Sequence, residues 1–430
     1  MRKLIAPFFT ILFFIFSNAA HAILSMELTQ GVSGAIPIAV VPFSVSGGEP
    51  SQDVSGVISN DLQNSGRFKV YGKSSLSAFP SSASDVSADY FKRLGTDNVV
   101  IGKVSPAGDG RYQVSFEMVD IYNGNNVTLK QKYTVSSKEL RAVAHHISDL
   151  IFEKLTGIRG VFSTKIAYIV VQNPGPSARY ILEVSDMDGY APKPLLNSPE
   201  PIMSPAWSPG GRQIAYVSFE NKRAGIYLQD VKTGQRRLLS QYPGINGAPA
   251  WSPDGSKLAL VLSKSGAPNI YIMNMYGKLT ELTHDFYINT EPAWAPDGKT
   301  LLFTSNRSGG PQIFQINLAT KAISRVTYDG AYNARASYTR DGKYIAMIHR
   351  VSGIYKIALL DPDTGVVKVL NGSAGDSSSP SVAPNNSMVL YDTMVGGHSV
   401  LGMVSSDGRV QITLPARNGD AQDPAWSPFL

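Results

Sequence analysis

The chain has 430 residues, of which 43% are hydrophobic and 17% are charged, so it has enough apolar material for a core and too little charge for general disorder. Lysine and arginine exceed aspartate and glutamate by only 39 − 33 = 6, which gives no argument for a nucleic-acid partner. Cysteine is absent, which excludes disulfides, thiolate metal sites and a cysteine nucleophile. The 39 glycines and 27 prolines predict many turns and a β-rich protein of two or three domains.

The first 22 residues have the three parts of a secretory signal peptide. Arg2 and Lys3 precede an apolar run from Leu4 to Phe16, and Ala20-His21-Ala22 is a small-residue cleavage site. The run is interrupted by a proline and is shorter than the roughly 20 residues that a membrane-spanning helix needs. We therefore expect cleavage after Ala22 and an exported chain that does not span a membrane.

Residues 23–34 form a segment of a different kind. Apolar and polar residues partly alternate around Met26 and Leu28, and Gly31 and Gly34 follow. This pattern predicts an extended arm. Two interpretations stay open, namely a terminus that is frayed or laid on the protein's own domains, and an arm that adds a strand to the sheet edge of a partner.

Residues 35–157 are predicted to form a small α/β domain. The apolar run from Ile36 to Phe43 is typical of a strand covered on both faces, and a helix follows with Asp53 as its cap and Gly66 at its end. A long amphipathic helix, roughly Lys138 to Leu155, closes the domain. Between these helices the pattern predicts a short helix and four strands, at Tyr90 to Leu94, Phe68 to Tyr71, Asn98 to Val104, Tyr112 to Asp120 and Val127 to Tyr133. A mixed sheet packed on helices is the natural architecture for this order.

Residues 158–430 contain six copies of one repeat. The motif Pro-Ala-Trp, followed by a proline and a tight turn, is clearest around Trp207, Trp251 and Trp294. Degenerate copies place Tyr338 and Val382 at the tryptophan position, and a final Pro-Ala-Trp ends at residue 426, so that the spacings are 44, 43, 44, 44 and 44 residues. A period of this length with four short strands per copy predicts a six-bladed β-propeller.

The two ends of the array predict how the ring closes. The first copy begins with the segment Lys165–Val170 and has no preceding Pro-Ala-Trp strand, whereas the last Pro-Ala-Trp has no further strands after it. We therefore expect Ala425 to Ser427 to pair with the first blade. One tryptophan per blade at a fixed register predicts packing between blades rather than ligand stacking.

The chain lacks catalytic and metal-binding signatures. No zinc-protease, nucleophile-elbow, phosphate-loop or dinucleotide motif is present. His145 and His146 are adjacent on a helix and point about 100° apart, so they cannot act as an i, i+4 metal pair. The run from Asp186 to Gly189 resembles the start of a calcium loop, but Asn197 stands where such a loop needs a bidentate glutamate. We predict a turn there, and no enzyme activity, catalytic residue, metal or cofactor.

The repeated Pro-Ala-Trp-Ser-Pro motif, after a signal peptide and an α/β domain that opens with Ile-Pro-Ile-Ala-Val-Val-Pro-Phe, resembles the TolB family of the Tol–Pal system of Gram-negative envelopes. The resemblance covers essentially the whole mature chain. It implies a monomeric periplasmic adaptor that binds the lipoprotein Pal at the propeller mouth and the C-terminal domain of TolA through the arm, with other outer-membrane proteins as further partners. It also implies roles in outer-membrane integrity, envelope constriction at cell division and protein import.

The resemblance also implies contact residues. Pal contacts in the family lie on loops that enter the inner propeller strands, and these match Asn246, Gly247, Ala248, Asn289, Thr290 and Glu291. The arm, as the TolA contact, contains Ile23, Leu24, Met26, Glu27, Leu28 and Val32. Ile245 stands where some relatives carry a histidine, so an apolar contact is expected there. Thr290 and Glu291 are expected to offer acceptors and a charge to the partner.

Two other functions stay open at this point. A propeller that binds cell-wall glycans would carry aromatic residues at its mouth and would be protected by sugars. A metal-dependent propeller hydrolase would need carboxylates that converge on the channel axis, and calcium would then shift its melting temperature.

Overall fold

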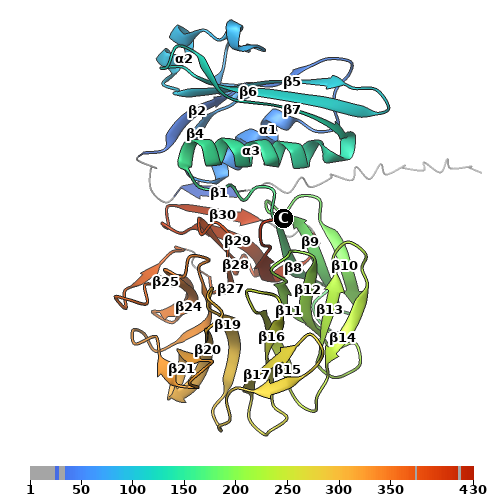
Figure 1. Cartoon of the computed structure of the whole chain (residues 1–430), viewed down its shortest axis with the longest axis vertical. Coiled ribbons are helices and arrows are strands. Elements are labelled where there is room, and N and C mark those ends of the chain that lie inside the picture. The colour runs from blue at the N-terminus through green and yellow to red at the C-terminus, as the bar shows by residue number, and fades with distance from the viewer. Residues whose placement is uncertain (1–24, 29–33, 373–374, 415–417) are drawn as a thin grey trace, which may run out of the picture.

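The computed structural model describes residues 25–28, 34–372, 375–414 and 418–430. Its described part contains a small α/β domain and a six-bladed β-propeller. Figure 1 shows the α/β sheet at one end of the molecule, helices α1 (Val54–Asn64) and α3 (Leu140–Thr156) beneath it, and the propeller beneath these helices. The two helices therefore lie between the sheet and the propeller. Among the described residues, no helix is long and apolar enough to cross a membrane.

The α/β domain has one mixed sheet in the order β4-β2-β5-β6-β7. Strand β2 is parallel to β4 and β5, the short β3 is parallel to β5, and β5, β6 and β7 are antiparallel. The mixed sheet with helices that the sequence predicts is confirmed. Its elements are β2 (Ile36–Val40), β3 (Ser44–Val45), α1 (Val54–Asn64), β4 (Phe68–Tyr71), α2 (Ala88–Leu94), β5 (Asn98–Pro106), β6 (Arg111–Asp120), β7 (Asn126–Ser136) and α3 (Leu140–Thr156).

The ends of α1 and α3 follow from local sequence. The carboxylate of Asp53 accepts a hydrogen bond from the backbone N–H of Gly56 at 2.9 Å and caps α1. Gly157 ends α3 with a φ of 71°. Gly66, just after α1, has a φ of 68°, and a Cβ built on it would lie 2.1 Å from a methyl carbon of Val410 in the propeller. Only glycine allows α1 to end so close to the propeller.

The propeller consists of six antiparallel sheets. Blade 1 contains β31, β8, β9 and β10, from the channel outward, and blades 2 to 6 each contain four consecutive strands. Their bounds are β8 (Lys165–Gln172), β9 (Arg179–Asp186), β10 (Lys193–Ser198), β11 (Ile202–Trp207), β12 (Gln213–Ser218), β13 (Gly225–Asp230), β14 (Arg236–Ser240), β15 (Asn246–Trp251), β16 (Lys257–Leu262), β17 (Asn269–Asn274), β18 (Leu279–Glu281), β19 (Asn289–Trp294), β20 (Thr300–Ser308), β21 (Gly310–Asn317), β22 (Ile323–Arg325), β23 (Asn333–Tyr338), β24 (Ile345–Val351), β25 (Ile354–Leu360), β26 (Val367–Val369), β27 (Ser377–Val382), β28 (Met388–Val395), β29 (His398–Ser405), β30 (Val410–Leu414) and β31 (Asp420–Trp426).

The ring closes as the repeat ends predict. Strand β31 from the end of the chain pairs antiparallel with β8, and Ala425 and Trp426 lie opposite Ala167 and Ile166. The indole N–H of Trp426 donates to the hydroxyl of Thr164 at 2.8 Å. The first blade thus takes its innermost strand from the C-terminus, and this strand covers the inner edge of β8.

The recurring tryptophans join neighbouring blades. The indole N–H of Trp207 donates to the carbonyl of Ala425 at 3.1 Å, and that of Trp251 donates to the carbonyl of Ala206 at 3.1 Å. Trp294 repeats the contact with Ala250 at 3.0 Å. Each acceptor lies on the innermost strand of the preceding blade, so the predicted role in packing between blades is confirmed.

One strand of the arm lies on the propeller. Strand β1 (Ser25–Leu28) pairs antiparallel with β30, the outermost propeller strand of blade 6, with Ser25 opposite Thr413 and Leu28 opposite Val410. Figure 1 shows β1 between β30 and helix α3. In this structure residues 25–28 therefore form a strand on the protein's own domain, which agrees with the first of the two interpretations.

Deletion of the last six residues tests the ring closure. Because it removes Ala425 and Trp426 and exposes the inner edge of β8, we expect the melting temperature to fall by on the order of 10 °C. Thermal unfolding of the truncated chain measures this. Deletion of Leu430 alone, which is 58% exposed, is the matched control. Equal melting temperatures for the two truncations would contradict the closure.

Candidate functional site

The inner strands of all six blades surround a channel of about 750 Å³. Strands β15 and β19 begin at one end of this channel, and the loops that enter them form what we call the mouth. Ala248, Thr290 and Glu291 line the channel. The mouth is therefore the place where the structure brings the two predicted Pal-binding segments together, on the neighbouring blades 3 and 4.

Each inner strand carries the same backbone irregularity just inside the mouth. The pairing register shifts at one point in each of the six strands, and one residue there has a positive φ between 45° and 54°. Such a β-bulge re-aims its side chain. All six residues line the channel, and they are Ser204, Ala248, Glu291, Arg335, Ser379 and Asp423.

Two of the predicted Pal-binding residues have a structural role. Asn246 is 1% exposed and Asn289 is 0% exposed. The side chain of Asn246 accepts from the N–H of Tyr242 at 2.9 Å and donates to its carbonyl at 2.7 Å. Asn289 donates to the carboxylate of Asp285 at 2.7 Å. These buried side chains hold the shape of the mouth loops.

The remaining predicted residues lie at the mouth and the channel wall. Gly247, Ala248 and Thr290 are half-buried, and Ala248 occupies the bulge position of its strand. Thr290 and Glu291 follow directly after the buried Asn289. The structure therefore brings the six residues together at the starts of two equivalent strands, with the asparagines buried and with Ala248, Thr290 and Glu291 lining the channel.

Glu291 is already paired within the protein. Its carboxylate accepts from the hydroxyl of Thr304 at 2.8 Å and from the backbone N–H of Arg335 at 2.9 Å. It also lies 3.7 Å from the guanidinium of Arg335. The sequence predicts that Glu291 offers its charge to a partner. In the structure this carboxylate already makes three contacts within the protein.

Arg335 lies on the inner strand β23 and contacts three other inner strands across the channel, β19, β27 and β31. Its Nη1 donates to Asp423 at 2.9 Å and to Ser379 at 2.7 Å, in addition to the contact with Glu291. Burial disfavours the guanidinium charge, but Asp423 and Glu291 outweigh burial and raise the pKa of Arg335 above its usual value. The cation therefore stays charged and links blades 4, 5 and 6 to the closing strand β31.

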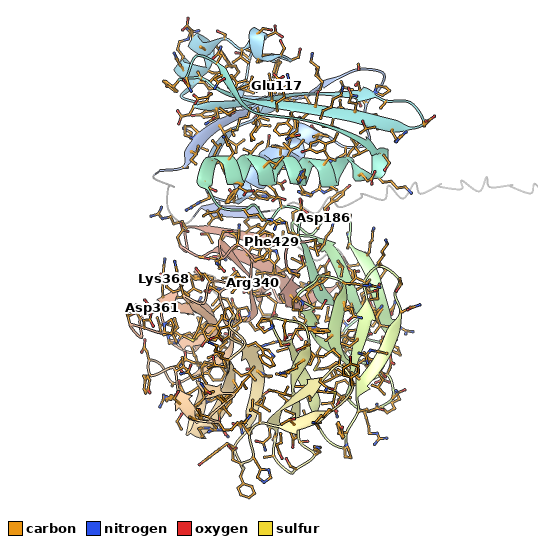
Figure 2. The ribbon with its side chains drawn as sticks, in the orientation of Figure 1. Glu117, Asp186, Arg340, Asp361, Lys368 and Phe429 are labelled. Atoms are coloured by element: carbon orange, nitrogen blue, oxygen red, sulfur yellow. The ribbon has the colours of Figure 1, made fainter. Side chains whose placement is uncertain are left out.

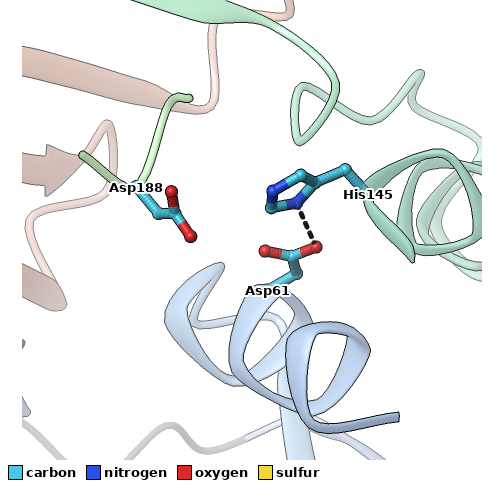
Figure 3. A group of neighbouring side chains, drawn as sticks. All are labelled: Asp61, His145 and Asp188. Atoms are coloured by element: carbon cyan, nitrogen blue, oxygen red, sulfur yellow. Dashed lines mark hydrogen bonds and ion pairs between the residues drawn. The ribbon is translucent and has the colours of Figure 1, made fainter. Parts of the chain in front are cut away.

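A second charged cluster lies between the α/β domain and the propeller, where Figure 2 shows Asp186. Nδ1 of His145 on α3 lies 2.8 Å from the carboxylate of Asp61 on α1, and its Nε2 lies 3.6 Å from Asp186. The side chain of His145 is only 3% exposed. Figure 3 shows the imidazole directly beside the carboxylate of Asp61, with the carboxylate of Asp188 on the opposite side of the cluster from α3. The segment from Asp186 to Gly189, which the sequence predicts only as a turn, thus supplies two carboxylates to the domain interface, Asp186 at the end of β9 and Asp188 in the turn after it.

The cluster is balanced in charge. Ligand-type atoms of Asp61, His145 and Asp188 all lie within 4.8 Å of one another, as a cation site would require. However, Arg141 pairs with Asp186 and Asp188, and Lys165 pairs with Asp186. With His145 protonated, three positive charges face three carboxylates, so a divalent ion would bring excess charge. We interpret the cluster as an ionic contact between the domains.

The carboxylates keep His145 charged. Burial lowers the pKa of His145, but Asp61, Asp186 and Asp188 outweigh burial and raise it from 6.5 to about 10. Burial likewise opposes the charge of Asp186, yet its contacts with His145 and Lys165 lower its pKa to about 2. Burial also raises the pKa of Asp61 above its usual value, despite the opposing effect of His145, so Asp61 loses its charge before Asp186 as the pH falls.

The predicted TolA-binding residues are only partly described. Met26, Glu27 and Leu28 lie in β1, and their backbone pairs with β30. Ile23, Leu24 and Val32 lie outside the described residues. The arm and the mouth use different parts of the propeller, because β30 is an outer strand and the mouth is built by inner strands.

The sequence interpretation did not single out the most exposed loop of the mouth. Phe286 is 100% exposed, Tyr287 is 47% exposed and Ile288 is 51% exposed, directly before Asn289. Ile245, the expected apolar contact, is 48% exposed directly before Asn246 on the neighbouring blade. The sequence feature that could have identified this loop is its run of three consecutive apolar residues between a turn and a short strand.

Comparisons with known proteins agree with this architecture. The family described as the TolB beta propeller domain matches residues 152–430, and the TolB amino-terminal domain matches residues 24–127. A protein of Coxiella burnetii named Tol-Pal system protein TolB is 51% identical over 97% of this chain and 96% of its own length. The protein of that name from Xanthomonas euvesicatoria is 47% identical over 94% of this chain and 93% of its own length. The crystal structure of TolB from Acinetobacter baumannii covers 94% of this chain and 100% of that chain, with 38% identity and a TM-score of 0.86.

Replacement of Glu291 by lysine tests the role of the channel network. Because Glu291→Lys removes one carboxylate from Arg335 and places a second cation beside it, we expect a loss of roughly 1–3 kcal/mol in the free energy of unfolding. Glu291→Gln keeps acceptors for Thr304 and the backbone, so it should lose less. Denaturant unfolding compares the two. A Glu291→Lys protein as stable as the wild type would show that the network contributes nothing.

The pH dependence of stability tests the ionic contact between the domains. The folded pKa of His145 is about 10 and the unfolded value is 6.5, so its stabilisation is complete below pH 6.5 and is lost as the pH rises to about 10. The free energy of unfolding should therefore fall in this window by up to about 1.4 kcal/mol per pH unit from this group.

The control for this pH dependence is His145→Gln. Glutamine can still donate to Asp61 but does not titrate, so the difference in stability between wild type and variant should shrink from pH 6.5 to pH 10. A constant difference across that range would mean that His145 is not charged in the folded protein.

Proposed function

The chain belongs to the TolB family, and its relatives are named as Tol–Pal system proteins. We propose that it is a non-enzymatic adaptor of the bacterial periplasm that joins two partners. The propeller mouth binds the soluble domain of Pal, and the N-terminal arm binds the C-terminal domain of TolA. Through these contacts the protein supports the integrity of the outer membrane and its constriction at cell division. It acts as a monomer, without a cofactor, after export and signal cleavage following Ala22.

The observation that carries the proposal is the presence of two separate docking elements in one chain. One is the open mouth of the propeller, where two equivalent inner strands begin on blades 3 and 4. The other is the terminal strand β1 on the outer strand β30. An adaptor needs two surfaces that can be used at the same time, and an inner mouth and an outer edge meet this requirement.

The mouth suits protein recognition because its loops are ordered by internal contacts. Asn246 and Asn289 hold the backbone of the two mouth loops, and Ala248, Thr290 and Glu291 line the channel behind them. A surface that is already ordered loses little conformational entropy on binding. We assign Pal to this surface, with the asparagines as positioning residues.

The arm suits a partner that accepts a β-strand. Residues 25–28 already form a strand by main-chain pairing, and the same hydrogen-bonding groups can pair with the sheet edge of another protein. Since β1 is occupied by β30, TolA binding through these groups requires β1 to leave the propeller. The arm therefore exchanges an internal partner for an external one.

Neither alternative function has comparable support. The two carboxylates that line the channel, Glu291 and Asp423, both pair with Arg335, which does not suit a hydrolase that must hold a metal and a water between free carboxylates. The exposed aromatic residues Phe286 and Tyr287 would fit the glycan-binding alternative. We interpret them as protein contacts because the relatives are named as components of a protein system.

Calorimetric titration tests the adaptor proposal. Residues 23–430 are titrated with the soluble domain of the organism's Pal and with the C-terminal domain of its TolA, and both titrations are repeated without residues 23–34. We expect Pal to bind both proteins and TolA to bind only the longer one. A failure of Pal to bind either protein would refute the adaptor function.

A reversible cross-link tests the exchange of the arm between β30 and TolA. Ser25 lies opposite Thr413 in the strand pairing, and the chain has no native cysteine. The double variant Ser25→Cys, Thr413→Cys should bind TolA only when reduced, while Pal binding persists in both redox states. TolA binding by the oxidised protein would show that β1 need not leave β30.

A further inference from the structure

We infer that the loop tip Phe286-Tyr287-Ile288, together with Ile245, is the apolar anchor by which the mouth holds a folded protein partner. The inference rests on the proposed function, since it takes the soluble domain of Pal as that partner.

The first observation is the exposure of these side chains to solvent. All four side chains are between 47% and 100% exposed, and they lie on loops of two neighbouring blades. Large apolar side chains gathered in this way mark interaction sites more often than plain surface.

The second observation is that the repeat does not require these residues. In blade 4 the residues before the asparagine that begins the inner strand are Phe286-Tyr287-Ile288. The corresponding residues are Pro243-Gly244-Ile245 in blade 3 and Gly330-Ala331-Tyr332 in blade 5. The third position is apolar in all three blades, but the first two positions carry aromatic rings only in blade 4. The ring of Tyr287 lies 5.6 Å from the guanidinium of Arg307, which helps to hold the loop. Phe286 is 100% exposed, and neighbouring loops reach their asparagine without an aromatic residue at its position, so Phe286 serves something other than the fold.

The third observation is that the loop is held rigid from below. The N–H of Tyr287 donates to Asp285 at 3.1 Å, and the N–H of Ile288 donates to the side chain of Asn306 at 2.9 Å. Arg307 then binds Asp285 at 3.0 Å and Asn289 at 2.8 Å. The polar groups beneath the tip are thus satisfied internally, and the apolar side chains above them are held out toward solvent.

This arrangement has the energetics of a binding hot spot. The ordering of the loop is already complete in the free protein, so a partner that covers Phe286 gains the burial of a large side chain at a small entropic cost. The side chain of Phe286 projects as a knob, which fits a pocket on a folded surface better than an extended peptide. Ile288 leads directly into Asn289 and Thr290, so the anchor is continuous with the mouth proposed for Pal.

The experiment compares two exposed aromatic residues of the propeller. Residues 23–430 carrying Phe286→Ser are titrated with the soluble domain of Pal, and Tyr276→Ser is the matched control. Tyr276 is 97% exposed on the turn between β17 and β18, at the end of blade 3 away from the mouth. We expect Phe286→Ser to weaken Pal binding by about tenfold or more, and Tyr276→Ser to leave it unchanged.

The possible outcomes can be told apart. Both variants should keep the wild-type melting temperature, because both side chains lie in solvent. Equal Pal affinity of wild type and Phe286→Ser would overturn the anchor while leaving the adaptor function intact. No Pal binding by the wild type would overturn both. Self-association of the wild type that Phe286→Ser abolishes, seen by light scattering, would assign the tip to a second copy of the chain and overturn the assignment to Pal.

Discussion

The propeller depends on the pairing of β31 with β8, because this contact turns a row of six similar sheets into a ring. The two strands come from opposite ends of the array, and the indole of Trp426 reaches Thr164 across the join. Once the ring is closed, every innermost strand has a neighbour on each side, and the tryptophans can donate to the preceding blade. The channel, its mouth and the loops around it all take their positions from this closure.

The α/β domain is attached to the ring by both apolar and ionic contacts. Residues of α1 and α3 share one core with strands β8 and β28 to β30, and Gly66 lets α1 end against Val410. At the edge of this core His145 stands among carboxylates from both domains. Strand β1 lies on β30, which is itself part of the shared core. The release of the arm that we propose for TolA binding would therefore take place next to the contact that fixes the two domains to each other.

At the mouth, some positions follow the repeat and others vary from blade to blade. The asparagine at the start of each of β15, β19 and β23 is buried, and the bulge inside each inner strand repeats six times. The residue type at the bulge varies between blades, and in blade 5 it is Arg335, which binds Asp423 and Glu291. The loop tips differ as well, and among blades 3 to 5 only the loop before β19 carries aromatic residues at its first two positions. In the function that we propose, partner recognition depends on these positions, at which the blades differ.

The sequence by itself determined the elements and their order, because helix caps, strand alternation and a 44-residue period are local or repeating signals. The cap at Asp53, the closing strand near Trp426 and the packing role of the tryptophans all follow from such signals and are confirmed. Only the tertiary structure decided which side chains meet across long stretches of chain. Glu291 meets Arg335, and His145 meets Asp186, through contacts that no local pattern encodes. Burial of Asn246 beside an exposed Ile245 was also beyond the sequence, since exposure depends on how neighbouring blades cover a loop.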